Sequence, residues 1–524
     1  MEHAQRGAAA FSIERRPWTK RRVCVIRNIG ANWIQLIVSI AVAYYLTPFT
    51  LHHLGHEQYG TWLLITALTG YLSLLVLGLP MASVRFVAKH ARDPDPTELN
   101  RAVANCLGIC GVLGLVAVLA GGVAFAVFTS YPISPALWPS AQLAFVIIVV
   151  NTALGFVGQL PLGILAAHEQ FVTQNKILLG SLLTRFVFTV TLLRLHPTFV
   201  VLAASLSLSM LIEAVAGAAA VRARYPHIRP RLADINWETT RAIFGFSLYV
   251  LLLAVGSQLA FQTDAIVIGK ILGVQSIPYF ATASLIAIYL MQLIIGIAAV
   301  VMPTAARLHA DGGLVPLRDI FLKWSKICLS LTLLASIYLL VIGPQFLGWW
   351  LGADFIGPGG GILRILTIGN LVFLPARGVA LPILMGIGNP RMPAIGFVAA
   401  GIVNLALSIV LGHYLGISGV AIGTIVPNMV FAALLIRSVC RTLGVEWREY
   451  FGYVVARPLV GALPVMATLY LATPLFSLEH FGGLFLAGVM MVTVFATAWV
   501  IFVYRGDRYI DLSRHLRSIL FRLA

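Results

Sequence analysis

The sequence predicts an all-α, polytopic membrane protein with about fourteen transmembrane helices. Composition is the first reason. Of the 524 residues, 59% are hydrophobic and only 10% are charged, whereas soluble globular proteins carry about 25% charged residues. The second reason is that apolar stretches recur along the whole chain, and a span needs about 20 apolar residues to cross a bilayer. The third reason is a regular alternation of basic and non-basic loops.

The apolar stretches set the limits of the predicted spans. Gly and Pro interrupt many of these stretches. Membrane helices tolerate such residues because neighbouring helices or cavity water satisfy the freed backbone groups. In chain order, the predicted spans cover residues 26–49, 59–80, 103–128, 140–166, 174–194, 198–221, 243–269, 278–302, 325–343, 361–386, 394–412, 416–437, 456–475 and 482–504.

The Lys and Arg residues give the orientation of these spans. With a cytoplasmic N-terminus, only Arg194 and Lys270 of the 36 Lys and Arg residues fall in outer loops. Arg185, Arg364 and Arg377 fall well inside spans, and the others lie in cytoplasmic loops, in the tails or at the cytoplasmic ends of spans. This distribution follows the positive-inside rule and predicts an even number of spans with both termini in the cytoplasm. Because the net charge of +17 is spread over short loops, it does not indicate a nucleic-acid partner.

Two pairs of similar segments indicate an internal repeat. Leu54-Gly55 and Tyr59-Gly60 follow the first predicted span, and Leu272-Gly273 with Tyr279 follows the seventh, at an offset of 218 residues. Residues 160–165 (LPLGIL) are matched by residues 381–386 (LPILMG) at an offset of 221 residues. Two matches at nearly the same offset predict a duplicated six-helix unit. An even number of helices per unit makes the two repeats parallel. Two units of six helices leave the last two of the predicted spans as an appendage.

The predicted organisation is that of a transporter. Two six-helix bundles with a cleft between them form a common transporter architecture. No predicted loop is long enough to hold a soluble catalytic domain, so we do not expect an enzyme. The predicted parts are a basic cytoplasmic tail at 1–25, an N-terminal bundle at 26–222, a cytoplasmic linker at 223–242, a C-terminal bundle at 243–440, two further helices at 456–504 and a basic cytoplasmic tail at 505–524.

Short motifs in the first twelve predicted spans carry a family resemblance. Each motif is degenerate, and the resemblance lies in the order and spacing of the whole set. They are Arg27-Asn28, Leu54-Gly55, Tyr59-Gly60, Gly78-Leu79-Pro80, Arg85-Phe86-Val87-Ala88, Asp264, Gly269-Lys270, Gly388-Asn389-Pro390-Arg391 and Leu415-Gly416-Ile417-Ser418-Gly419. In these motifs the chain resembles the polysaccharide-transporter, O-antigen-flippase-like branch of the MATE-like MOP flippase superfamily.

The resemblance implies a flippase of the bacterial inner membrane. Such a protein carries an undecaprenyl-pyrophosphate-linked oligosaccharide, a unit of O-antigen, capsule or exopolysaccharide, from the cytoplasmic to the periplasmic leaflet by alternating access. It uses no cofactor, although transport can be coupled to Na⁺ or H⁺. The expected partners are the lipid-linked substrate, membrane lipids and a polysaccharide polymerase or co-polymerase, and the expected state is a monomer.

Three alternatives stay open beside this hypothesis. A cation-coupled drug exporter of the same superfamily would favour acidic residues in the first span, which has none. A lipid II flippase would carry an Arg-Asp pair where this chain has Arg27-Asn28. A membrane-embedded glycan ligase or polymerase would have a large outer loop with catalytic residues, but segment 344–360 carries Asp354 and no Lys or Arg.

Cations inside or beside the spans are the candidate pyrophosphate ligands. Arginine suits this role because its planar fork binds phosphate bidentately and stays charged. Arg377 lies near mid-depth and is flanked by Pro375 and Pro382, which predict a bend. Arg185 also lies near mid-depth. The alternative for Arg377 is a structural pairing with a carboxylate or with carbonyl groups freed by the prolines, and the alternative for Arg185 is a buried structural ion pair. Arg27 and Arg85, near the cytoplasmic ends of the first two spans, are candidates as well. The alternative is that they anchor the protein at the membrane surface.

Acidic and amide residues complete the candidate site. Asp264 and Glu213 are the candidates for ion coupling, because charges inside spans are costly and mark functional sites. Asp264 could instead pair with Lys270, and Glu213 with Arg185. Among the amides, Asn32 and Gln258 are the candidates for sugar contact, because the helices that carry them face the cleft in the family that the chain resembles.

The cysteines do not indicate a metal site. The chain has five of them, all in or beside apolar segments. Cys106 and Cys110 are four residues apart and share one helix face. No His or Asp lies close by in sequence to complete a metal site, so we expect buried thiols and no bound metal.

Overall fold

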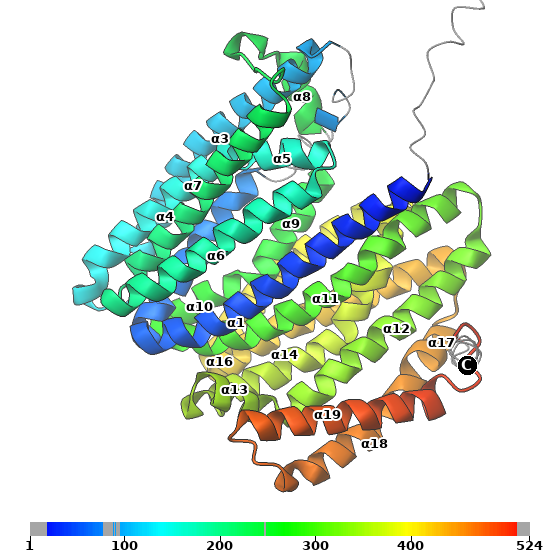
Figure 1. Cartoon of the computed structure of the whole chain (residues 1–524). Helices are drawn as coiled ribbons and strands as arrows, with labels where there is room; N and C mark the ends of the chain where they lie inside the picture. The colour runs from blue at the N-terminus through cyan, green and yellow to red at the C-terminus, as the bar shows by residue number, and fades with distance from the viewer. Residues whose placement is uncertain (1–17, 77–86, 89, 91–94, 246–247, 511–524) are drawn as a thin grey trace, which may run out of the picture.

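The computed structural model describes the whole chain except residues 1–17, 77–86, 89, 91–94, 246–247 and 511–524 (Figure 1). Every regular element within the described residues is helical. The helices of the first half are α1 (Trp18–Gly70), η1 (Tyr71–Val76), α3 (Thr97–Phe128), η2 (Pro135–Leu137), α4 (Trp138–Gly158), α5 (Leu160–Ala167), α6 (Phe171–Leu195), α7 (Phe199–Arg224), η3 (Leu232–Asp234) and α8 (Trp237–Gly245).

The second half is helical as well. Three of its short segments, η6, η7 and η9, are π-helical. Its elements are α9 (Leu248–Phe261), α10 (Thr263–Ile271), η4 (Val274–Ser276), α11 (Ile277–Ala310), α12 (Leu314–Val341), α13 (Gly343–Leu351), η5 (Ala353–Phe355), α14 (Pro358–Pro375), η6 (Ala376–Ala380), α15 (Leu381–Gly386), α16 (Arg391–Leu443), α17 (Trp447–Tyr450), η7 (Phe451–Ala456), α18 (Arg457–Ala472), η8 (Thr473–Leu475), α19 (Phe481–Ala498) and η9 (Trp499–Val503).

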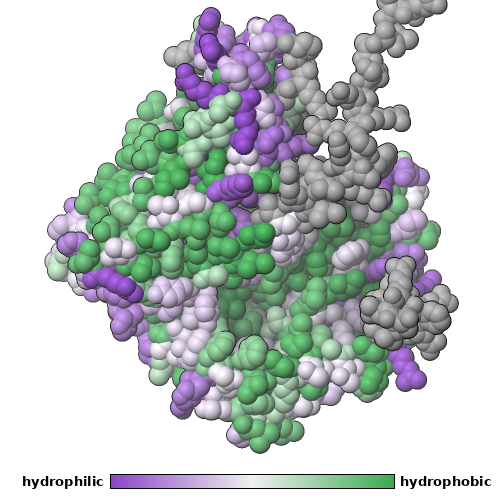
Figure 2. Space-filling model, in the orientation of Figure 1, coloured by the Kyte–Doolittle hydropathy of each residue, from purple (hydrophilic) through white to green (hydrophobic). Residues whose placement is uncertain are grey.

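The helices are those of a multi-pass membrane protein. Twelve helical segments of the described residues are long and apolar enough to cross a bilayer. Large apolar side chains on their outer faces are exposed, such as Leu115, Leu119 and Val123 on α3. Figure 2 shows apolar residues over the flanks of the molecule, while hydrophilic residues gather at the end that carries α8. Apolar exposure on this scale fits a surface that faces lipid rather than water.

Two of the twelve segments reverse direction at a glycine. Helix α1 leaves helical geometry at Gly55, and α16 does so at Gly416, both at positive φ. The arms of α16 lie side by side, because Ser408 donates to the carbonyl oxygen of Val420 at 3.4 Å across the break. Each of the two segments therefore covers two predicted spans. Twelve segments do not by themselves reproduce the count of about fourteen spans, which stays a prediction.

The helices form two groups, seen at the upper left and the lower right of Figure 1. Helices α3, α4, α6 and α7 pack on one another in the first group, and α9, α11, α12, α14 and α16 in the second. Helix α1 contacts α6 of the first group and α11 of the second. The predicted boundary at residue 222 falls two residues before the end of α7, but the predicted division into domains stays a prediction.

The backbone recurs at the predicted repeat. Gly55 and its counterpart Gly273 both have positive φ, at 70° and 87°. Glu169 and Gly388, at nearly the same offset, also share positive φ, at 59° and 81°. Among the described residues, Glu169 is the one non-glycine residue in this conformation, which L-residues adopt rarely. These recurrences agree with the predicted duplication.

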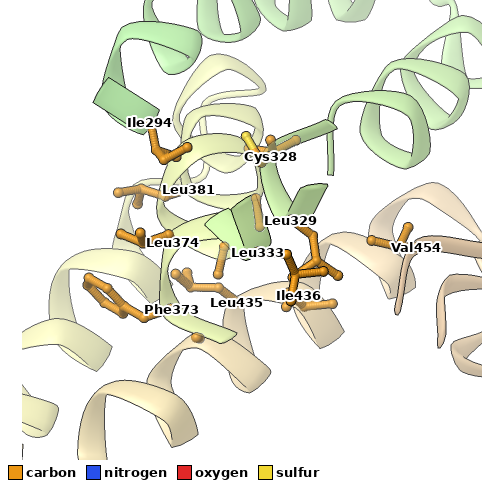
Figure 3. Close-up of a cluster of buried hydrophobic side chains, with 14 of the residues drawn as sticks. Ile294, Cys328, Leu329, Leu333, Phe373, Leu374, Leu381, Leu435, Ile436 and Val454 are labelled. Atoms are coloured by element: carbon orange, nitrogen blue, oxygen red, sulfur yellow. The ribbon is translucent and has the colours of Figure 1, made fainter. Parts of the chain in front are cut away.

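The second group has a dense apolar core (Figure 3). Side chains from α11, α12, α14, α15 and α16 converge there, among them Ile294, Leu333, Leu374, Leu381 and Leu435. The last helices, α18 and α19, pack against α12 and extend this core at the lower edge of Figure 1. The appendage predicted at residues 456–504 is thus attached to the C-terminal group.

The predicted cytoplasmic linker is held on the first group. Asn105 of α3 accepts hydrogen bonds from the backbone of Asn236 at 3.0 Å and from the hydroxyl of Thr240 at 2.9 Å. Asn100, also on α3, accepts from the backbone of Arg229 at 2.7 Å. The linker is therefore attached to α3 by hydrogen bonds.

Candidate substrate and cation sites

Arg377 lies in the π-helical segment η6, between Pro375 and Pro382. A π-helical turn often marks a functional site and is a common place for a helix to kink, so its position agrees with the bend predicted from the two prolines. The guanidinium lies 5.6 Å from the centre of the Phe397 ring. Within the described part of the chain, Nε of Arg377 is buried and has no hydrogen-bond partner, and the ion pairs found there do not include Arg377.

An unpaired arginine at this depth is costly. Removing a charge from water is repaid only when a counter-charge and hydrogen bonds replace the lost hydration, and charged residues inside a membrane are rare unless they serve a function. The structural alternative considered for Arg377, a carboxylate partner, is not observed among the described residues. The cation is thus available to an anionic ligand.

Asp264 is the second residue of α10 and is only 2% exposed. Its Oδ1 atom accepts a hydrogen bond from the hydroxyl of Thr424 at 3.0 Å, and Ser408 lies within hydrogen-bonding reach. Ser408 in turn donates to Oδ1 of Asn404 at 2.8 Å and to the carbonyl oxygen of Val420 at 3.4 Å. Five residues from α10 and the two arms of α16 thus bring oxygen atoms together around one carboxylate.

The alternative pairing of Asp264 with Lys270 is wrong. Nζ of Lys270 donates instead to the carbonyl oxygen of Ser130, at 2.8 Å. The ion pairs found in the described residues do not include Asp264. A buried carboxylate without a basic partner is costly inside a membrane, so a proton or a cation has to neutralise it.

Arg185 and Glu213 lie on the adjacent helices α6 and α7 of the first group. Glu213 accepts a hydrogen bond from the hydroxyl of Ser181 at 2.6 Å. The carboxylate of Glu213 interacts electrostatically with the guanidinium of Arg185. The ion pairs within 4.0 Å in the described residues do not include this pair. Nε of Arg185 is buried without a hydrogen-bond partner there. The expected close ion pair is thus replaced by a looser arrangement.

The other predicted site residues are placed in part. Gln258 of α9 lies against Gly70 at the end of α1, where its Nε2 atom would be 2.9 Å from a Cβ placed on the glycine. Arg27 and Asn32 lie on α1, but their side chains are outside the described residues, and so is Arg85. The structure does not gather the candidates into one place, because Arg185 and Glu213 belong to the first group and Arg377 and Asp264 to the second.

The ion pair of Lys326 with Asp507 is buried and was not predicted from the sequence. Lys326 lies near the predicted cytoplasmic end of its span and was counted as a loop charge, yet its side chain is fully buried and pairs with Asp507. Tyr453 donates to the other carboxylate oxygen at 2.8 Å. Burial alone would raise the pKa of Asp507, but the hydrogen bonds from Lys326, from the backbone of Tyr509 and from Tyr453 hold that pKa below its usual value. The position of Lys326 inside an apolar stretch was the available signal.

The two helix groups are joined at the predicted outer end. Nε2 of His56, beside the reversal of α1, lies 3.1 Å from Oδ2 of Asp354 in η5. The indole of Trp350 donates to the carbonyl oxygen of Tyr44 at 2.9 Å, and the two rings stack. Tyr131 donates to the carbonyl oxygen of Ile266 at 3.2 Å. These contacts join α1 and the segment after α3 to α10, α13 and η5.

Comparison with protein families decides the assignment. Residues 25–309 match the model of a family described as polysaccharide biosynthesis protein. The chain belongs to this polysaccharide biosynthesis protein family. It is also 24% identical over 426 residues to the uncharacterized membrane protein EpsK of Bacillus subtilis (strain 168), covering 78% of this chain and 82% of that protein.

Solved structures share the fold of this family member. A lipid II flippase, MurJ, in an inward closed conformation has a TM-score of 0.69 at 14% identity, covering 91% of this chain and 99% of MurJ. An inward-facing multidrug resistance MATE family transporter of the MOP superfamily has a TM-score of 0.66 at 18% identity, covering 78% and 94%. The predicted polytopic helical fold is confirmed by these structures, and the predicted resemblance to a polysaccharide family is confirmed by the family match.

Proposed function

We propose that this membrane protein is a flippase for an undecaprenyl-pyrophosphate-linked oligosaccharide. It would move the O-antigen, capsule or exopolysaccharide unit from the cytoplasmic to the periplasmic leaflet of a bacterial inner membrane, without altering it chemically. The family points to polysaccharide assembly, and the observation that carries the proposal is the unpaired cation Arg377 within an apolar helix group. Both termini would lie in the cytoplasm, as the Lys and Arg distribution indicates.

The pyrophosphate explains why an unpaired arginine is kept. Two phosphate groups need a fixed cation to enter an apolar slab, and a guanidinium binds phosphate oxygens through paired N–H groups. Arg377 has a free Nε and no counter-ion within the described residues. Arg185, in the other group, would offer a second cation. Arg27, Arg85, Asn32 and Gln258 stay candidates for receiving the head group and its sugars.

Transport by alternating access would separate the two helix groups at their outer end. The contacts of His56 with Asp354 and of Trp350 with Tyr44 would then break. These contacts are one histidine–carboxylate contact between partly exposed side chains and one hydrogen bond from a buried indole to a backbone carbonyl, each worth about 1 kcal/mol.

Asp264 would couple this movement to an ion. A carboxylate, two hydroxyls, an amide oxygen and a backbone carbonyl form the set of hard oxygen ligands that suits an alkali cation, and the carboxylate alone can take a proton. The ligands come from α10 and from both arms of α16, so ion binding would fix the positions of these helices relative to one another. The proposed coupling ion is Na⁺ or H⁺.

Loss of the protein in its native cell tests the proposed function. We expect surface polysaccharide to disappear and the lipid-linked oligosaccharide to accumulate in the cytoplasmic leaflet, where an added periplasmic glycan-binding probe cannot reach it. Resupplied wild-type protein should reverse both effects. Unchanged polysaccharide together with increased drug sensitivity would instead support a drug exporter, and accumulation of unlinked glycan intermediates in the periplasm would support a ligase or polymerase.

An Asp264→Asn variant tests the coupling. In proteoliposomes, gradient-driven transport should fall by about tenfold or more, within the range of coupling free energies between linked sites. The change is nearly isosteric and keeps an acceptor for Thr424, so folding should be preserved. Glu213→Gln is the comparison variant, because that carboxylate bonds Ser181 and we expect little loss of coupling. Equal gradient dependence in wild type and Asp264→Asn would exclude Asp264 as the coupling residue.

A further inference from the structure

His56 follows the reversal of α1 and lies against η5 at the predicted outer end. Its Nε2 atom is 3.1 Å from Oδ2 of Asp354, and the two side chains are 35% and 49% exposed. The imidazole also lies beside the rings of Tyr279 and Phe355, with ring centres 5.1 and 5.5 Å away. Residues of α11 and η5 thus hold this imidazole beside one carboxylate.

Asp354 is the anion in contact with this imidazole. Tyr279 of α11 donates a hydrogen bond to the same Oδ2 atom at 3.3 Å and is an uncharged donor. Glu57, the next residue after His56, has another partner, because its Oε1 atom accepts from the backbone and the hydroxyl of Ser134 at 3.1 and 2.5 Å. The neighbouring elements η4 and α13, which also contact α1, carry no titratable side chain.

The basic side chains near this contact have other partners as well. They are His52 on the preceding turn of α1, Arg194 of α6 and Lys270 of α10, which contact the ring of His53, the ring of Phe49 and the carbonyl oxygen of Ser130 respectively. Nδ1 of His56 is buried without a hydrogen-bond partner among the described residues. Asp354 is therefore the group that favours a charged imidazole.

The strength of this contact depends on pH. Histidine gains its charge between about pH 8 and pH 5. A neutral ring donates one ordinary hydrogen bond to the carboxylate, and a protonated ring adds the attraction of opposite charges. Because that attraction exists only while the two side chains are in contact, protonation favours the closed outer end, and opening that end favours release of the proton.

We propose that His56 and Asp354 form an acid-strengthened latch, which holds the outer end closed more firmly as the solution on that side becomes acidic. The inference rests on the proposed alternating access, in which this contact breaks. It adds a control on outward opening that requires neither the substrate nor Asp264. Outward release of the cargo should therefore slow in acid.

Distances between spin labels across the outer end test the latch in the purified full chain. The labels are placed at Thr129→Cys, after α3, and Ile356→Cys, after η5, both exposed positions, in a protein whose native cysteines are replaced by alanine. Between about pH 8 and about pH 5.5, we expect the ratio of short to long distances to rise about twofold to fivefold, as for a partly exposed ion pair.

Matched variants show which group is responsible for the response. His56→Gln keeps a side-chain N–H donor but cannot become charged, so its distance ratio should not change with pH. Asp354→Asn removes the anion and should abolish the response too. His413→Gln makes the same change at an exposed histidine of α16, whose Nδ1 atom lies 2.8 Å from the carbonyl oxygen of Ile409 on its own helix, and should respond like wild type.

Two results would overturn the latch. One is a pH response in His56→Gln equal to that of wild type, because another group must then be responsible for it. The other is a wild-type distance distribution that is the same at both pH values. No substrate is present in these measurements, so either result leaves the flippase proposal standing. Unchanged surface polysaccharide in cells without the protein would instead remove the flippase proposal while the latch keeps its pH response.

Discussion

An Arg377→Ala variant is expected to lose transport of the lipid-linked oligosaccharide while still folding. Truncating one partner of a buried, hydrogen-bonded charge pair costs about 2–5 kcal/mol of binding, which corresponds to a loss of well over tenfold in substrate affinity. The folded state without substrate should not suffer, because Arg377 has no ion-pair partner to leave behind within the described residues. The measurements are surface polysaccharide in cells and substrate binding by the purified protein, at matched expression.

Two further variants sharpen this prediction. Arg364→Ala removes an arginine from the same stretch of chain, α14, where its Nε donates to the carbonyl oxygen of Leu340 at 2.9 Å on an exposed face; transport should be retained. Arg377→Lys keeps the charge but loses the planar fork, so partial activity is expected. Full surface polysaccharide in a well-expressed Arg377→Ala strain would show that the pyrophosphate is bound elsewhere.

A Lys326→Ala variant is expected to destabilise the protein more than any exposed charge change. The variant leaves Asp507 buried without its cation, and breaking a buried pair in this way costs about 3–5 kcal/mol. Because Lys326 lies on α12 and Asp507 follows η9, the loss should loosen the last helices first. Thermal unfolding of purified protein and proteolysis of its C-terminal region measure the effect.

The control for Lys326 restores charge balance. In the double variant Lys326→Met/Asp507→Asn, neither charge is buried, and the amide oxygen introduced at position 507 can still accept from Tyr453, so most of the stability should return. Arg101→Ala breaks the exposed pair with Glu98 and should cost less than about 1 kcal/mol. If Lys326→Ala unfolds at the wild-type temperature, the buried pair contributes nothing to holding the last helices.

The sequence predicted the helical fold well because the bilayer imposes simple local rules. A helix that crosses hydrocarbon must be long and apolar, so α3, α6, α7 and the consecutive helices α4 and α5 coincide closely with four predicted spans. Positive φ was not foreseen at Glu169, because no residue type marks it. The reversals at Gly55 and Gly416 join spans that the sequence separated, since the helical hydrogen bonding continues almost to the glycine on both sides.

The candidate site was predicted less completely. Arg377 was singled out because an arginine between two prolines inside an apolar stretch is conspicuous. Thr424 and Ser408 were not predicted to lie beside Asp264, because hydroxyls are common in membrane helices and carry no charge to mark them. The spacing of four residues from Asn404 to Ser408 is visible in the sequence but is not specific.

By itself, the sequence determined that the chain is a multi-pass helical membrane protein with few charges inside its helices. These properties follow from composition and segment length, which the bilayer constrains locally. Only the tertiary structure decided which of those charges are paired. Thr424 reaches Asp264 across 160 residues, and Lys326 reaches Asp507 across 181. Packing of distant helices makes these contacts, and the same packing leaves Arg377 unpaired within the described part of the chain.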